Sequence, residues 1–174
     1  MHSLLKKLRG GDRRSIGRVE EVVEDVLEDA SLFEPLLGGL FVDDPVVRMR
    51  AADAVEKITA DRWELLQPHK SRLIRVAGQT DQQEVRWHVA QILPRLQLDP
   101  EEKKRAVNIL YAYLDDRSKI VVTFALQALA DFAVGDKKLR PDVVRLLREF
   151  IKTGSPAIKS RGKKLLERLK PQLS

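Results

Sequence analysis

Apolar and small residues recur with helical spacing in four segments that align without gaps. Within each twelve-residue segment, positions 1, 5, 8, 9 and 12 are apolar or small, and at 100° per residue these positions share one face of a helix. The first residues of successive segments are 38, 36 and 37 residues apart. The pattern predicts four amphipathic helices that repeat along the chain. They cover residues 47–58, 85–96, 121–132 and 158–169.

A second apolar pattern precedes each of these segments at a matching offset and predicts a leading helix in every repeat. Pro68 and Pro141 each lie 17 residues before the first residue of their segment. Proline suits the first turn of a helix, so both prolines predict where a leading helix begins. The leading helices are expected to end at Gly78, at the Asp115–Asp116 pair and at Gly154. The repeating unit is therefore helix, short turn, helix, with about 37 residues.

The pattern also predicts how the chain is organised. Residues 1–14 are expected to be a flexible basic tail, and residues 15–174 a single repeat domain. A further helix, with apolar spacing from Ile16 to Leu27 and Ser15 as its cap, precedes the first repeat. The last repeat is very polar, as a solvent-facing cap should be, and the capping features at both ends favour a full-length chain. The repeats are expected at about residues 31–59, 62–97, 100–134 and 137–170.

The repeat resembles that of the HEAT family. In that family an Asp opens the second helix and is followed by Val-Arg and a pair of small residues. Here Asp43, Val47-Arg48 and Ala51-Ala52 carry the signature, and Asp81, Val85-Arg86 and Ala90 carry it again. The third repeat has Arg117 and Val122 at the charged positions, and the fourth has Gly154 and Lys159. The resemblance covers about residues 31–170.

The resemblance implies an all-α fold, an α-α superhelix of about four two-helix repeats plus an N-terminal helix. It also implies that the second helices line a groove used for binding. Arg48 and Arg86 are expected to pair with Asp43, Asp81 or carboxylates of a neighbouring repeat as a structural ladder. That ladder should be broken in the C-terminal half. Such solenoids carry many roles, so the resemblance predicts the fold more sharply than the function.

The composition fits a folded domain. Apolar residues make up 43% of the chain and charged residues 33%, which supports a packed core rather than disorder. The chain has no cysteine, so disulfides and thiolate metal sites are excluded. No apolar run reaches about 18 residues, and the N-terminus lacks the apolar region of a signal peptide. The expected location is the cytoplasm, without membrane contact.

The sequence does not predict an enzyme. His2, His69 and His88 lack the spacing of a metal site, and no phosphate-binding glycine loop or GxSxG motif occurs. No catalytic residue, metal or cofactor is expected. A HEAT-like class of DNA glycosylases is catalytic and uses Trp, Asp and Arg around a damaged base. Trp87 with Asp53 and Arg50 imitates that set, which keeps a glycosylase as a remote alternative.

The first hypothesis for function is therefore a non-catalytic scaffold that binds a protein or peptide in the groove lined by the second helices. Tryptophan and arginine dominate the energetics of many interfaces, which makes Trp87 a candidate hot spot. The alternative is that Trp87 lies flat against the neighbouring repeat. Six residues are the candidate partner-binding set: Arg50, Trp87, His88, Gln91, Arg95 and Gln127.

Two residues near this set have local consequences. Pro94 lies inside the second repeat helix, where it removes an amide donor and clashes with the preceding turn. It predicts a kink or an early helix end. Trp63, in the linker before Pro68, is expected to pack that linker onto the repeats.

The charge distribution supports a second hypothesis. The chain carries a net charge of +6, but residues 20–44 contain nine Asp and Glu and no Lys or Arg, whereas residues 136–174 contain twelve Lys and Arg against four Asp and Glu. A basic end attracts phosphates, so nucleic acid is the alternative partner. The candidate contacts are Lys159, Arg161, Lys163, Lys164 and Arg168. A monomer is expected, with head-to-tail self-association of the acidic and basic ends as the alternative.

Overall fold

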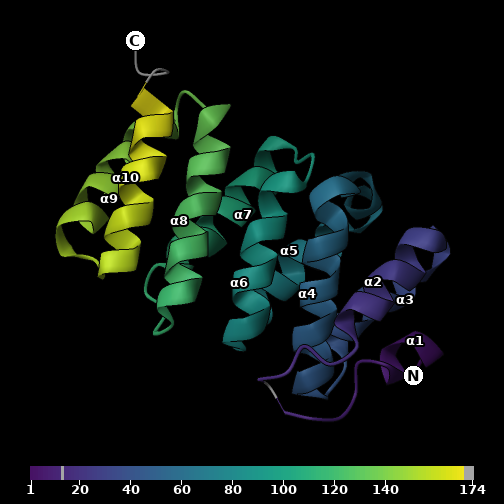
Figure 1. Ribbon diagram of the computed structural model, residues 1–174. Helices are drawn as coiled ribbons and strands as arrows, with labels where there is room; N and C mark the ends of the chain where they lie inside the picture. The colour runs from purple at the N-terminus through teal and green to yellow at the C-terminus, as the bar shows by residue number, and fades with distance from the viewer. Residues whose placement is uncertain (13, 171–174) are drawn as a thin grey trace. The chain divides into compact units, whose positions relative to one another are not determined.

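The regular secondary structure of the protein is helical throughout residues 1–12 and 14–170, which are the residues described by a computed structural model (Figure 1). Residue 13, expected in the tail, and residues 171–174, expected in the repeat domain, lie outside the described residues. The chain divides into an N-terminal unit, residues 1–99, and a C-terminal unit, residues 100–174. The single continuous domain expected from the sequence stays a prediction.

The N-terminal unit contains six α-helices and four 3₁₀ segments among its described residues. The α-helices are α1 (Ser3–Lys6), α2 (Val19–Glu28), α3 (Phe33–Gly38), α4 (Pro45–Asp61), α5 (Lys70–Gln79) and α6 (Gln83–Ile92). The 3₁₀ segments are η1 (Ala30–Leu32), η2 (Gly39–Phe41), η3 (Trp63–His69) and η4 (Leu93–Arg95). Helix α4 packs against both α2 and α6, so it forms the centre of this unit.

The C-terminal unit contains two helical hairpins among the residues that the structure describes. The first pairs α7 (Pro100–Tyr113) with α8 (Lys119–Val134), and the second pairs α9 (Arg140–Thr153) with α10 (Pro156–Leu169). Helix α10 packs against both α8 and α9. The four predicted repeat helices are thus confirmed as α4, α6, α8 and α10, each preceded by a shorter or comparable leading helix.

Side-chain caps explain why three of these second helices begin where they do. The Asp44 carboxylate accepts hydrogen bonds from the Val46 and Val47 amides at 2.9 and 3.3 Å, and Pro45 opens α4. Ser118 caps α8 in the same way, and Ser155 caps α10. These groups satisfy amide donors that the first helical turn leaves free.

Two prolines have the effect on helix boundaries that the sequence predicts, and a third does not. Helix α6 ends at Ile92 and continues as the 3₁₀ segment η4, which contains Pro94, so the predicted early end is confirmed. Pro141 lies in the first turn of α9, as expected. Pro68 instead lies inside η3, and α5 begins two residues later at Lys70.

The N-terminal segment differs from the expected flexible tail. Helix α1 lies within it, and Leu4, Leu5 and Leu8 are all buried, with Leu8 at 0% exposure. These leucines pack onto the first repeat, because apolar side chains on one end of a repeat stack need a cover. Ser15 is also not the cap of α2: its hydroxyl accepts from the Gly17 amide, and Arg18 precedes the helix without a side-chain cap.

Candidate partner-binding surface

Three residues of the candidate set lie together on α6. Trp87 is partly exposed, and its ring centroid lies 5.8 Å from that of His88, with the two ring planes tilted by 58°. The Gln91 amide donates a hydrogen bond of 3.1 Å to the Trp87 main-chain oxygen. The Trp87 indole N–H makes no hydrogen bond with any described residue. Trp87 therefore presents an apolar ring and a free donor at the surface of α6.

His88, like its neighbour, is partly buried. Its Nδ1 is buried and has no hydrogen-bond partner among the described residues. Burial lowers the pKa of His88 below its ordinary value, and Lys57 adds to that effect, whereas Asp53 and Glu56 of α4 oppose it. His88 is therefore neutral at pH 7. An unpaired, buried Nδ1 costs less free energy on a neutral imidazole than on an imidazolium.

Arg95 is brought close to this group, but its guanidinium is already engaged. Its Nη1 donates to the Glu56 main-chain oxygen at 2.6 Å and to the Thr59 hydroxyl at 3.0 Å. Its Nη2 forms an ion pair of 2.5 Å with the Glu56 carboxylate. Arg95 thus fixes η4, which continues α6, to α4. Its guanidinium supports the surface from below and is not free to contact a partner.

The same position carries an ion pair in other repeats. Arg95 occupies position 11 of its repeat helix, and Lys57 and Arg168 occupy position 11 of α4 and α10. Lys57 pairs with Glu20 of α2 at 2.5 Å, and Arg168 pairs with Asp131 of α8 at 2.6 Å. Each cation therefore reaches an acidic residue of another helix in its own unit. We call these three pairs the position-11 ladder.

The expected ladder was wrong in its acceptors at Arg48, whereas its Arg86 part stays a prediction. Arg48 Nη1 donates to the main-chain oxygens of Val42 and Asp43, at 2.8 and 2.9 Å, rather than to a carboxylate. Arg86 Nε donates to the Thr80 main-chain oxygen at 2.8 Å. These turns leave main-chain carbonyls without a helical partner, and the guanidinium at position 2 donates to them.

Gln82 connects the first two repeats and was not singled out from the sequence. Its Oε1 accepts from Arg48 Nε at 3.0 Å, and its Nε2 donates to the Pro45 main-chain oxygen at 2.8 Å. A glutamine just before a helix is an unremarkable residue, and its partners are 34 and 37 residues away along the chain. No local pattern indicates such a contact.

Arg50 does not belong to the partner-binding surface, and that prediction was wrong. It is 2% exposed, and its guanidinium donates to the main-chain oxygens of Leu8, Gly10, Asp12 and Ser15 at distances from 2.7 to 3.2 Å. The side chain therefore holds the N-terminal segment against α4. Because it is buried, Arg50 also cannot complete a glycosylase-like set with Trp87 and Asp53.

Gln127 lies in the C-terminal unit, on α8. Its Nε2 donates to Asp131 at 3.1 Å, and its Oε1 accepts from Arg161 Nη1 at 2.9 Å. Gln127 therefore links α8 to α10. A role in partner binding stays a prediction for this residue.

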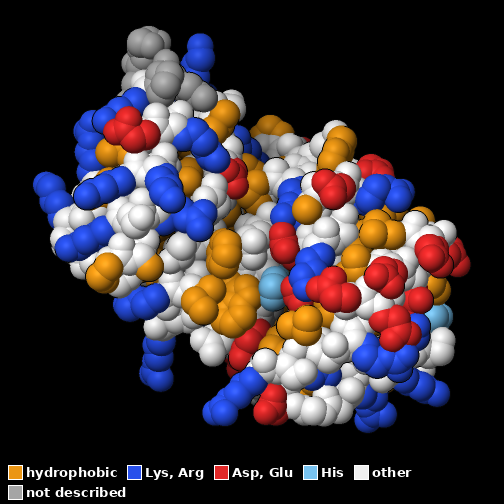
Figure 2. All heavy atoms as spheres, in the orientation of Figure 1, with side chains coloured by type: hydrophobic (Ala, Val, Ile, Leu, Met, Phe, Trp, Pro, Cys, Tyr) orange, Lys and Arg blue, Asp and Glu red, His pale blue; other side chains and the backbone are white. Residues whose placement is uncertain are grey.

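The five residues of the basic set all lie on α10, and two of them are engaged. Arg161 contacts Gln127, and Arg168 pairs with Asp131. The side chains of Lys159, Lys163 and Lys164 have no ion pair or hydrogen bond with a described residue. Figure 2 shows Lys and Arg side chains gathered over α9 and α10, and acidic side chains over α2 and α4.

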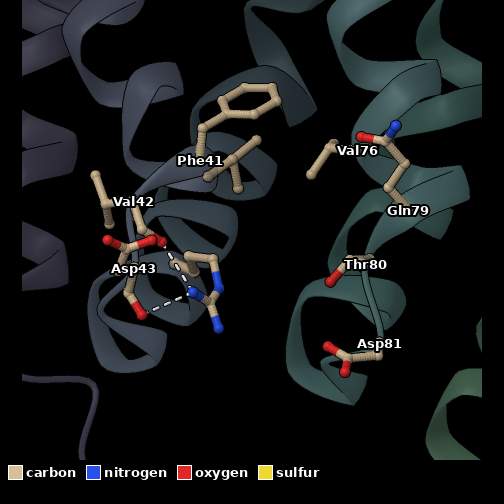
Figure 3. Close-up of a pocket in the computed structure, with 9 residues that line it drawn as sticks. Phe41, Val42, Asp43, Val76, Gln79, Thr80 and Asp81 are labelled. Carbon is tan, nitrogen blue, oxygen red and sulfur yellow. Dashed lines mark hydrogen bonds between the residues drawn. The ribbon is translucent and has the colours of Figure 1, made fainter.

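A small open cavity of about 310 Å³ lies between the two turns that join the helices of the first and second repeats. Val42 and Asp43 lie on one side of it, and Thr80 and Asp81 lie on the other (Figure 3). Phe41 covers one end, with the guanidinium carbons of Arg72 and Arg75 both 5.3 Å from its ring centroid. The cavity was not expected from the sequence, because its walls come from turns about 38 residues apart.

Residues 1–12 and 14–170 contain no group of three or more His, Cys, Asp or Glu side chains placed to hold a metal ion. None of the helices within those ranges combines the length and the apolar character that crossing a bilayer requires.

Comparison with solved structures identifies the same architecture. An engineered protein superposes with a TM-score of 0.67 at 20% identity, covering 97% of this chain and 80% of that one. A designed armadillo repeat protein gives 0.64 at 19% identity, covering 95% and 80%. A designed armadillo repeat protein in complex with the peptide (KR)4 gives 0.65 at 18% identity, covering 94% and 79%.

Comparisons of the sequence assign no narrower group. No protein-family model matches the chain, and no curated protein matches it either. Identities near 20% with the solved structures carry the fold and not the activity. The protein has an all-helical repeat fold of the α-α superhelix class, consistent with repeats of the HEAT and armadillo type.

Proposed function

We propose that the protein is a non-catalytic repeat scaffold that binds a protein or peptide partner on the face formed by α4 and α6. Trp87 is the anchor of this face, with His88 and Gln91 beside it. The observation that carries the proposal is the partly exposed Trp87 ring with its unpaired indole N–H. A large, amphipathic side chain of this kind loses little conformational entropy on binding and supplies much of the contact area.

The surroundings of Trp87 support this role because they are fixed before a partner arrives. The ion pair of Arg95 with Glu56 holds the end of α6, and Gln91 is held against the Trp87 main-chain oxygen. The Gln91 Oε1 has no partner among the described residues, so it is free to accept a hydrogen bond from a peptide amide. A preorganised surface loses less free energy on binding than a mobile one.

The structural neighbours favour a peptide as the partner. One is a designed armadillo repeat protein in complex with the peptide (KR)4, and another is described as computationally designed for modular peptide recognition. In a repeat scaffold, an extended segment lies across successive second helices. By this analogy, we infer that a linear peptide segment of a partner protein lies across α4 and α6 of this chain, and that the chain acts as a monomer.

Selection of peptides from a random library tests the proposal. Linear twelve-residue peptides displayed on phage would be enriched on the immobilised protein, and the affinities of the synthetic peptides would then be measured by calorimetry. We expect Trp87→Ala to weaken binding by roughly tenfold or more, because loss of a hot spot costs about 2 kcal/mol. Failure to enrich any peptide would contradict the proposal.

A matched control separates the site from a general effect of removing tryptophan. Trp63 is the other tryptophan of the chain, is 44% exposed and lies in η3, outside α4 and α6. Trp63→Ala should leave the peptide affinity unchanged within about twofold. Circular dichroism of both variants checks that each keeps its helices. Equal losses in the two variants would refute Trp87 as the anchor.

A further inference from the structure

We infer that α9 and α10 form a second binding surface, which takes the phosphate backbone of duplex nucleic acid without reading its sequence. The surface is separate from the peptide face proposed on α4 and α6. It consists of cations that have no ion pair or hydrogen bond with a described residue: Arg148 and Lys152 on α9, and Lys159, Lys163 and Lys164 on α10. We call these five residues the α9–α10 cations.

The balance of charge differs strongly between the two units. The C-terminal unit carries 17 Lys and Arg against nine Asp and Glu, whereas the N-terminal unit carries 15 against 17. The basic excess of the whole chain therefore comes from residues 100–174. Within an electrostatic field of this sign, phosphates gather faster than neutral or cationic ligands.

Local ion pairs do not use up this excess. Asp142 pairs with Arg145 on α9 at 2.6 Å, and Glu167 of α10 pairs with Lys170, the residue that follows this helix, at 2.5 Å. Arg168 is held by Asp131 of α8. Glu149 is the remaining acidic residue on the two helices, and no cation of residues 1–12 or 14–170 lies at ion-pair distance from it. Within the described part of α9 and α10, five unpaired cations thus stand against one unpaired carboxylate.

The packing of the hairpin places these cations at matching levels. A side chain at Gly162 would meet Ile151 and the Leu147 main-chain oxygen, so α10 approaches α9 closely at this point. In an antiparallel pair with that contact, Lys163 lies level with Arg148, and Lys159 lies level with Lys152. Along each helix the two levels are about 6 Å apart. Phosphates of one DNA strand recur about every 3.4 Å along the duplex axis, so alternate phosphates match this spacing.

The absence of aromatic side chains decides between classes of nucleic acid. Phe150 is the one aromatic residue of α9 and α10, and it is partly buried. Single-stranded nucleic acids need exposed rings on which their bases stack. Lysine and arginine side chains without such rings contact phosphates, which fix position but carry no sequence information. The surface therefore suits the backbone of a duplex.

Fluorescence anisotropy of a labelled 20-base-pair DNA duplex tests the inference. We expect binding at 50 mM salt, with a slope of log K against log salt of about −4 for about five phosphate contacts. The double variant Lys163→Glu/Lys164→Glu should weaken binding at least tenfold and reduce the slope by about 2. The control Arg117→Glu/Lys119→Glu makes the same change of charge in the same unit, outside α9 and α10, and should weaken binding less than about threefold.

Three results would overturn the inference. The first is no binding of the duplex at 50 mM salt. The second is an equal loss in the two double variants, which would show that only net charge matters. The third is equally tight binding of poly-L-glutamate, which would assign the surface to acidic polypeptides. The variant Trp87→Ala should leave duplex binding intact, so failure here is distinguishable from failure of the peptide proposal.

Discussion

Arg95 and Glu56 are joined twice, once through the Glu56 carboxylate at 2.5 Å and once through its main-chain oxygen at 2.6 Å. The pair connects η4, which continues α6, to the preceding repeat helix α4. A bidentate contact of this kind specifies geometry as well as energy, because the guanidinium fork fits few arrangements of acceptors. It sets the position of α6, and with it the position of Trp87.

Loss of this pair should destabilise the protein. We expect Arg95→Ala to lower the free energy of unfolding by about 2 kcal/mol, because it leaves partly buried acceptors without a charged donor. Urea denaturation measures this change. In a double-mutant cycle with Glu56→Gln, the coupling free energy should be about 1 kcal/mol. Purely additive effects would show that the ion pair contributes little beyond its separate residues.

Arg50 should contribute strongly to the stability of the protein, because its guanidinium holds the N-terminal segment. The side chain satisfies four carbonyls of residues 8–15 and has no carboxylate partner among the described residues. Arg50→Met should cost about 3 kcal/mol and should expose residues 8–17 to limited proteolysis. Arg14→Met, which removes an exposed cation of the same segment, should leave both measurements unchanged. Equal proteolysis of the two variants would contradict the clamp.

Two glycines of the N-terminal segment offer a sharper test of the same clamp. Gly10 and Gly17 both have positive φ, at 79° and 57°. A Cβ on Gly17 would lie 2.8 Å from the Arg50 guanidinium carbon, whereas one on Gly10 would meet nothing within 4 Å. Each change to alanine adds backbone strain, but only Gly17→Ala adds a clash. Thermal denaturation should therefore show a larger loss for Gly17→Ala, and a larger loss for Gly10→Ala would contradict the account.

Burial of His88 should make the protein less stable in mild acid. Its folded-state pKa lies below the unfolded value of about 6.5, so the unfolded chain binds the proton first as the pH falls. The free energy of unfolding should therefore be unaffected above pH 6.5 and should fall as the pH drops below 6.5 toward the folded-state pKa. His88→Gln should flatten this part of the profile.

His69 must be separated from His88 in that experiment. Burial also lowers the pKa of His69, with Arg72 adding to the effect, so it contributes a slope of the same sign. The variant His69→Gln therefore serves as the parallel measurement, and the double variant should be flatter than either single variant. An unchanged slope in His88→Gln would show that the imidazole is protonated without cost in the folded state.

Much of the fold follows from the sequence because repeats depend on short-range patterns. The apolar positions of residues 47–58 and their three counterparts specify helices with one buried face, and Pro94 specifies an early end within its own turn. Both features need only neighbours a few residues away. The N-terminal tail was misjudged because three leucines in a basic stretch do not reveal that a repeat end nearby needs covering.

The sequence predicts the candidate partner-binding residues less well than the fold, because several of their contacts are long-range. Trp87 and His88 are consecutive residues of α6, so their proximity follows directly from the sequence. The structural roles of Arg50 and Arg95 depend on hydrogen-bond partners 35 to 42 residues away. No local pattern distinguishes a guanidinium that holds another segment from one that is free. Alignment of the repeats offers one signal that was available: position 11 holds Lys57, Arg95 and Arg168, each of which has an acidic partner on another helix.

The most direct test of the central claim uses a variant with a single tryptophan. Because the chain has only two, Trp63→Phe leaves Trp87 as the sole indole. We predict that titration with a selected peptide shifts or quenches its emission, and that the change saturates at the concentration at which calorimetry shows binding. Heat of binding without any change in Trp87 emission would contradict the claim that the partner binds on the α4–α6 face.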